Sequence, residues 1–136
     1  MFLSFILISS LSSACSQISF VEHPQDGQFY CRDLITNEAI VPVSGSITTP
    51  DVDELALVVF KDGVYYQSDI ESLIYTNGQA SFDLAVTIVA GLHNYNFYLY
   101  AQKSGIRRQI MSARQIVCGD AFIINGQSNA VATDYH

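Results

Sequence analysis

One serine near the end of the sequence has neighbours that suit covalent chemistry. Ser128 lies in the run NGQSNA that begins at Asn125, directly after the apolar residues 121–124. A serine hydroxyl becomes a nucleophile when a general base takes its proton and hydrogen-bond donors stabilise the oxyanion. Gly126 permits a tight turn, and the backbone N–H of Ser128 could donate to an oxyanion. The pattern predicts a nucleophile delivered by a buried strand; the alternative is a turn or helix N-cap serine, a position that serine favours.

The base that Ser128 would need is not predicted within this sequence. A serine nucleophile normally relies on a histidine that a carboxylate orients. Asp134 and His136 follow Ser128 closely, but their spacing is wrong for such a pair, and we interpret them as residues without a catalytic role. We therefore expect residues 1–136 alone to be inactive and the base to be encoded farther along the gene.

The composition narrows the class of protein. The 136 residues are 49% hydrophobic, which is enough to bury the core of one domain. The formal net charge is -7 with six Lys and Arg, so clustered cations for nucleic-acid binding are missing. The three histidines are scattered and no Cys-x-x-Cys spacing occurs, so we expect neither a metal site nor a cofactor.

The N-terminal residues indicate export. Residues 1–16 are uncharged and rich in Leu, Ile, Phe and Ser, which is typical of a secretory signal and too short to cross a bilayer. Either cleavage after a small-x-small run, which we favour, or lipidation of Cys15 fits the residues around that position. The mature chain would then be secreted, periplasmic or surface-bound, without a transmembrane segment. Its cysteines, Cys31 and Cys118, would form a disulfide or remain free thiols, and the sequence leaves both open.

Between these two regions the sequence alternates short strands with tight turns. Asp62-Gly63 and Asn77-Gly78 are typical of type I′ hairpin turns, and residues 80–88 alternate apolar and polar side chains. Such a series predicts a mainly-β fold, a two-sheet sandwich. Tyr95 lies in a run that resembles the tyrosine corner of immunoglobulin-like and fibronectin type III modules; the alternative is a strand aromatic. The expected strands are 28–32, 39–48, 53–60, 64–68, 80–88, 95–102 and 106–117.

The segment around Ser128 resembles one known family. Gly119-Asp120, an apolar strand and Gly126-Gln127-Ser128-Asn129 are similar to the first block of the SGNH hydrolases, in the branch of sialate O-acetylesterase-like carbohydrate esterases. The resemblance covers residues 117–130. It implies an immunoglobulin-like sandwich at 17–117, after the signal at 1–16, followed at 118–136 by the first strand and turn of an α/β catalytic domain.

The resemblance also implies a function. Ser128 would be the nucleophile and a backbone oxyanion donor, and the full-length bacterial protein would remove acetyl groups from a carbohydrate. The alternative is a secreted module without catalysis, either a spacer or a binding module for glycans or proteins. In that case Tyr65, Tyr66, Tyr98 and Tyr100 could form an aromatic platform, unless they serve strand packing.

Overall fold

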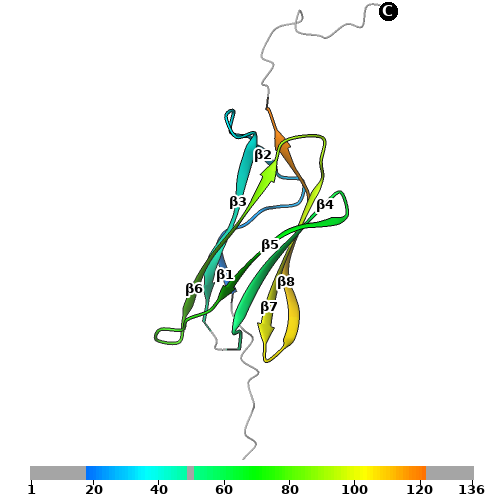
Figure 1. Ribbon diagram of the computed structural model, residues 1–136. Coiled ribbons are helices and arrows are strands. Elements are labelled where there is room, and N and C mark those ends of the chain that lie inside the picture. Colours follow the sequence, from blue (N-terminus) through cyan, green and yellow to red (C-terminus); the bar gives the residue numbers. More distant parts are fainter. Residues whose placement is uncertain (1–17, 49–50, 122–136) are drawn as a thin grey trace, which may run out of the picture.

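The computed structural model describes residues 18–48 and 51–121 as a β-sandwich. Figure 1 shows the strands in two layers, with β1, β3 and β6 on one side and β4, β7 and β8 on the other. The mainly-β expectation is confirmed, and within these residues no helix is long and apolar enough to span a membrane. The strands are β1 (Ile18–Glu22), β2 (Phe29–Cys31), β3 (Glu38–Ile47), β4 (Glu54–Lys61), β5 (Val64–Ser72), β6 (Ala80–Val89), β7 (Tyr95–Lys103) and β8 (Ile106–Gly119).

The two sheets differ in size and in strand direction. The smaller sheet has the order β1-β3-β6, and the larger has the order β2-β8-β7-β4-β5. Every pair is antiparallel except β2 with β8, which run parallel. The strand β2 was expected as part of 28–32, whereas β1 is a strand that the sequence did not predict.

The core lies between the sheets and follows the period-two pattern of the strands. In β6 the residues Ala80, Phe82, Leu84, Val86 and Ile88 are buried, and the residues between them face outward. Since successive side chains of a strand point to opposite faces, this pattern places one whole face of β6 in the core. The largest fully buried side chains from the other strands are Tyr95, Phe97, Ile47, Leu55, Leu57, Leu99, Ile116, Val41 and Val43.

Two-residue turns with positive φ connect the hairpins. Asp62 and Gly63 have φ values of 52° and 82°, which is the backbone that a type I′ turn requires. Asn77 and Gly78 adopt the same pattern at 53° and 79°. The predicted turns are therefore present at both sites. The second turn is flanked by the isolated bridge Thr76–Gln79 and not by long strands.

The side chain of Tyr95 ties the sheets together. Its ring is fully buried, its hydroxyl donates to the carbonyl of Val89 at 3.0 Å, and it accepts from the N–H of Val89 at 3.2 Å. This is the backbone contact that the tyrosine-corner interpretation expects, a hydroxyl bonded a few residues upstream of a strand start. Burial is the main cause that raises the pKa of this phenol, so the hydroxyl stays protonated and can donate.

Carboxylates of β5 cover part of the free edge of β6. Asp69 accepts from the N–H of Ala85 at 3.0 Å, and Glu71 accepts from the N–H of Asp83 at 2.9 Å. An edge strand with bare N–H groups invites pairing with another chain, and inward-pointing charges are one way to block it. The two carboxylates thus close the sandwich on this side.

Candidate functional site

The residues that the sequence singled out for chemistry lie beyond the described part of the chain. Ser128, Gly126 and Cys15 fall outside residues 18–48 and 51–121. The structure instead shows the place from which the segment that carries Ser128 continues. β8 ends at Gly119, two residues past the expected end of the sandwich at 117, and the description stops at Ala121.

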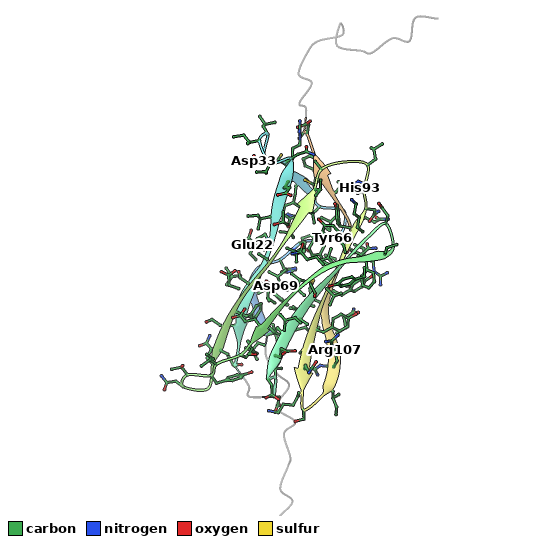
Figure 2. All side chains as sticks on the ribbon, in the orientation of Figure 1. Glu22, Asp33, Tyr66, Asp69, His93 and Arg107 are labelled. Carbon is green, nitrogen blue, oxygen red and sulfur yellow. The ribbon has the colours of Figure 1, made fainter. Side chains whose placement is uncertain are left out.

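We call this end of the sandwich the exit end. It consists of loop 32–37, loop 90–94, the turn at 62–63 and residues 119–121, and it lies opposite the start of β1 (Figure 1). Figure 2 places Asp33 and His93 at this end, on either side of the end of β8, and Arg107 toward the other end.

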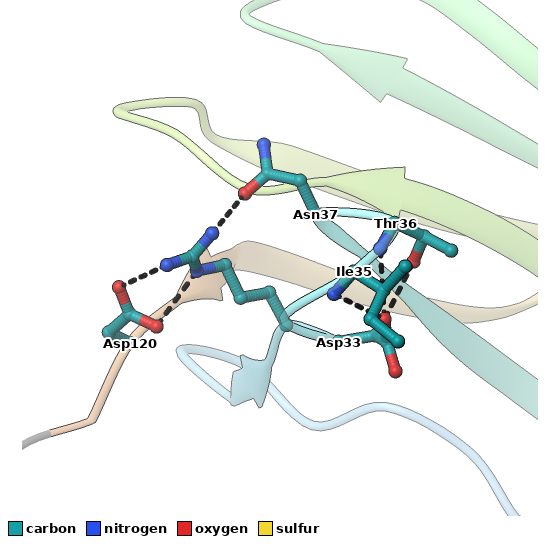
Figure 3. Close-up of polar contacts among 6 residues, drawn as sticks. Asp33, Ile35, Thr36, Asn37 and Asp120 are labelled. Atoms are coloured by element: carbon teal, nitrogen blue, oxygen red, sulfur yellow. Dashed lines mark hydrogen bonds and ion pairs between the residues drawn. The ribbon is translucent and has the colours of Figure 1, made fainter.

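An arginine fixes the chain where it leaves the sandwich. The Nε and Nη2 of Arg32 donate to the two carboxylate oxygens of Asp120 at 2.8 and 3.0 Å, and Nη1 donates to Oδ1 of Asn37 at 2.7 Å (Figure 3). This two-pronged geometry suits a planar guanidinium and a carboxylate. The hydrogen bond with Arg32 is the main cause that lowers the pKa of Asp120. The backbone N–H of Arg32 also donates to the carbonyl of Gly119 at 2.9 Å.

A second aspartate shapes loop 32–37. One carboxylate oxygen of Asp33 accepts from the N–H groups of Ile35 and Thr36 at 2.8 and 2.9 Å (Figure 3). These backbone donors lower the pKa of Asp33, and the N–H of Thr36 has the largest effect. The carbonyl of Asn37 accepts from the N–H of Ala90 at 2.9 Å, which joins this loop to loop 90–94. The ordered loop presents Leu34 and Ile35 to solvent.

A hollow at the exit end lies between loop 90–94 and the end of β8. Leu92 stands fully exposed at its rim, and Phe29 and Val117 are partly exposed beside it. The bare backbone of Gly119 also lines it, and a β-carbon added there would meet the Phe29 ring at 3.9 Å. The hollow therefore combines apolar side chains with the Arg32–Asp120 pair.

His93 and Asp62 form a pair that was not predicted from the sequence. Nδ1 of His93 lies 2.8 Å from Oδ2 of Asp62, whose other oxygen accepts from the N–H of Asn94 at 2.9 Å. The hydrogen bond from the N–H of Asn94 is the main cause that lowers the pKa of Asp62, and the hydrogen bond from His93 is the second cause. The pairing of β4 with β7 sets Lys61 opposite Tyr95, which brings the two loops together. Because the side chains are 36% and 49% exposed, we interpret the pair as a link between loops.

The two cysteines that the structure describes lie on neighbouring strands and are free thiols there. Cys118 is the register partner of Tyr30, and Gly119 is the partner of Cys31. Consecutive positions of a strand face opposite sides, so Cys118 is buried in the core while Cys31 is exposed. Burial is the main cause that raises the pKa of the Cys118 thiol, and the nearby Cys31 raises it further. The disulfide stays a prediction.

The predicted tyrosine platform divides between the two faces of the larger sheet. Tyr66 packs edge-on against Tyr95 at a centroid distance of 5.5 Å, on the core side. Phe60 lies 5.9 Å from Tyr98 and 6.4 Å from Tyr65, so these rings gather on the outer face. We call the outer hollow that Phe60, Tyr98, Tyr100, Asn96 and Gly63 line the aromatic hollow.

No cluster in the described residues has the composition of a metal site. Among residues 18–48 and 51–121, no group of three or more His, Cys, Asp or Glu side chains is placed to hold an ion.

Two comparisons of the sequence with known proteins give no match. A scan against protein-family models finds no family that matches, and a search of curated proteins finds no relative. The resemblance to the SGNH hydrolases therefore remains a prediction from residues 117–130.

Proposed function

We propose that the sandwich is the N-terminal module of an exported serine esterase that removes acetyl groups from a carbohydrate. The observation that supports this most is where the sandwich ends. The last carbonyls of β8, at Cys118 and Gly119, accept from the N–H groups of Gly91 and Arg32. The last strand of the sandwich thus ends at Gly119, inside the block 117–130 that resembles the SGNH hydrolases.

The strand arrangement is compatible with the module type that the proposal needs. Two packed sheets and the Tyr95–Val89 contact, in which a tyrosine hydroxyl bonds to backbone a few residues upstream, are features of immunoglobulin-like sandwiches. We propose this class for residues 18–121. A fold alone does not establish an activity, so the enzymatic proposal rests on Ser128.

The proposed chemistry is acyl transfer. The hydroxyl of Ser128 would attack the ester carbonyl while a base takes its proton, and the backbone N–H of Ser128 would stabilise the oxyanion. The sugar hydroxyl would leave with a proton, and water would then release acetate from the acyl-enzyme. The base and its carboxylate partner would come from residues beyond His136.

An activity measurement on two proteins tests this proposal. We expect the 136-residue chain to hydrolyse p-nitrophenyl acetate no faster than its Ser128→Ala variant. The protein translated from the gene with the codons that follow His136 should hydrolyse acetylated sugars and lose that activity in Ser128→Ala. A stop codon at that point, or a longer protein in which Ser128→Ala retains its rate, would overturn the esterase proposal.

The aromatic hollow supports a second candidate, a glycan-binding module. Tyr98, Tyr100 and the amide of Asn96 line this hollow together, and the guanidinium of Arg107 lies 5.5 Å from the Tyr100 ring centre. Small-molecule sites combine aromatic surface with a few polar groups in this way, and a sugar ring offers an apolar face and hydroxyl groups to match. Under this candidate, Tyr98→Ala should abolish the binding of neutral oligosaccharides in calorimetric titration, whereas Ile74→Ala in loop 73–79 should leave it unchanged. Equal binding by both variants would reject it.

A further inference from the structure

The exit end holds its loops in fixed positions while it leaves apolar side chains in water. Loop 32–37 is ordered by Asp33, and its Asn37 carbonyl joins it to Ala90 of loop 90–94. Yet these loops expose Leu34, Ile35 and Leu92. Burial of an exposed leucine against apolar surface is favourable, so these loops leave stabilisation unused. Single exposed aliphatic residues need no explanation, but Leu92 stands at the rim of a hollow that Phe29 and Val117 also line.

The chain itself supplies an apolar segment at this place. Asp120 lines the hollow and is held by both prongs of Arg32, so the direction in which the chain leaves is fixed. The residues that follow Ala121 are Phe122, Ile123 and Ile124. A chain advances at most about 3.3–3.6 Å per residue, so the backbone of Phe122 begins within about 7 Å of Asp120.

We propose that the hollow at the exit end is a docking surface for the apolar segment 122–124 of this chain, with Phe122 against Leu92 and Phe29. The lining combines the apolar side chains of Leu92, Phe29 and Val117 with the backbone of Gly119, and it includes Asp120, from which the chain continues. Docking would bury Leu92 and Phe122 together and would set the orientation of whatever continues after residue 124. The proposal does not depend on esterase activity, because it concerns only where the segment packs.

The absence of tryptophan from the sequence allows a direct test in the full chain. Phe122→Trp introduces a unique tryptophan, since the natural sequence contains none. We expect its fluorescence to lie at shorter wavelength than that of the unfolded chain, with a several-fold smaller quenching constant for iodide. Adding Leu92→Ser should shift the emission toward that of the unfolded chain and restore most of the quenching.

A matched variant and a dilution series complete the test. Ile74→Ser replaces another exposed aliphatic residue, in loop 73–79 at the other end, and should leave the fluorescence of Phe122→Trp unchanged. Each of three results would overturn the proposal: quenching as in the unfolded chain, protection that Leu92→Ser does not alter, or protection that is lost on dilution. The last would mean that a second copy covers the hollow. None of these results decides the esterase proposal, which the Ser128→Ala measurement tests separately.

Discussion

At the scale of single residues, the two described cysteines should differ sharply in reactivity. Cys31 is exposed, whereas Cys118 is 3% exposed and has a raised pKa because of burial. The thiolate is the reactive form, so a buried thiol with a raised pKa reacts slowly. We expect iodoacetamide to modify Cys31 in the folded protein and Cys118 only after unfolding in urea, as read by mass spectrometry of the peptides.

The same measurement shows whether the two cysteines form a disulfide. If both thiols resist iodoacetamide in the folded and the unfolded protein until a reductant is added, a Cys31–Cys118 bond exists. The Cβ vectors of the two residues would then have to approach each other, which the register of β2 on β8 does not allow without backbone movement. A Cys31→Ser variant provides the control, since it should lose the fast-reacting peptide and keep the slow one.

At the scale of elements, the approach of β1 to β3 depends on a glycine. A β-carbon added at Gly45 would overlap the carbonyl oxygen of Ser19 and come within 2.8 Å of the Phe82 ring. Because the nearest of these atoms is backbone, β1 would have to move away from β3, and overpacking of this kind costs about 1–3 kcal/mol. We expect Gly45→Ala to lower the free energy of unfolding by that amount in urea denaturation. The neighbouring Ser46→Ala should change it by less than about 0.5 kcal/mol, and equal effects of the two variants would show that β1 adapts.

The elements also show which parts of the fold the sequence could predict. The turns at 62–63 and 77–78 were predictable because Asp-Gly and Asn-Gly favour positive φ locally. β6 was predictable because its apolar residues occupy every second position and so face the same core. β1 was not, since most of its side chains are partly or fully exposed and its position depends on pairing with the distant β3.

The candidate site was less accessible to sequence reasoning than the fold. The pairs Arg32–Asp120 and Asp62–His93 join residues that are 88 and 31 positions apart. Such partners are set by strand register, which a sequence without its fold does not contain. The type of chemistry proposed for Ser128 came from a local pattern, whereas the exit end became visible only when the loops were placed together.

At the scale of the whole molecule, acidification should weaken the links between distant loops. Three aspartates have pKa values that are lowered by hydrogen-bond donors from other segments. The main donor is Lys103 for Asp53, Asn94 for Asp62 and Arg32 for Asp120. A carboxylate whose pKa is lower in the folded state binds fewer protons there than in the unfolded chain. Its contribution to stability is complete above the usual value of 3.8 and is lost as the pH falls through the lower folded value. We therefore expect the thermal unfolding midpoint to stay level from neutral pH to about pH 5 and to fall as the pH drops below 4.

The Asp120→Asn variant assigns part of this acid sensitivity to the exit end. An asparagine cannot ionise, so the variant should be less stable than the natural chain at pH 7, and the two midpoints should converge as Asp120 becomes protonated in acid. Circular dichroism melts from pH 7 to pH 2.5 measure this convergence. A gap that is the same at every pH would mean that Asp120 stabilises the exit end by packing and not by its charge. The Arg32 guanidinium would then not hold the departing chain electrostatically, and the fixed direction of residues 119–121 would have to come from the backbone bonds of Gly119 and Cys118.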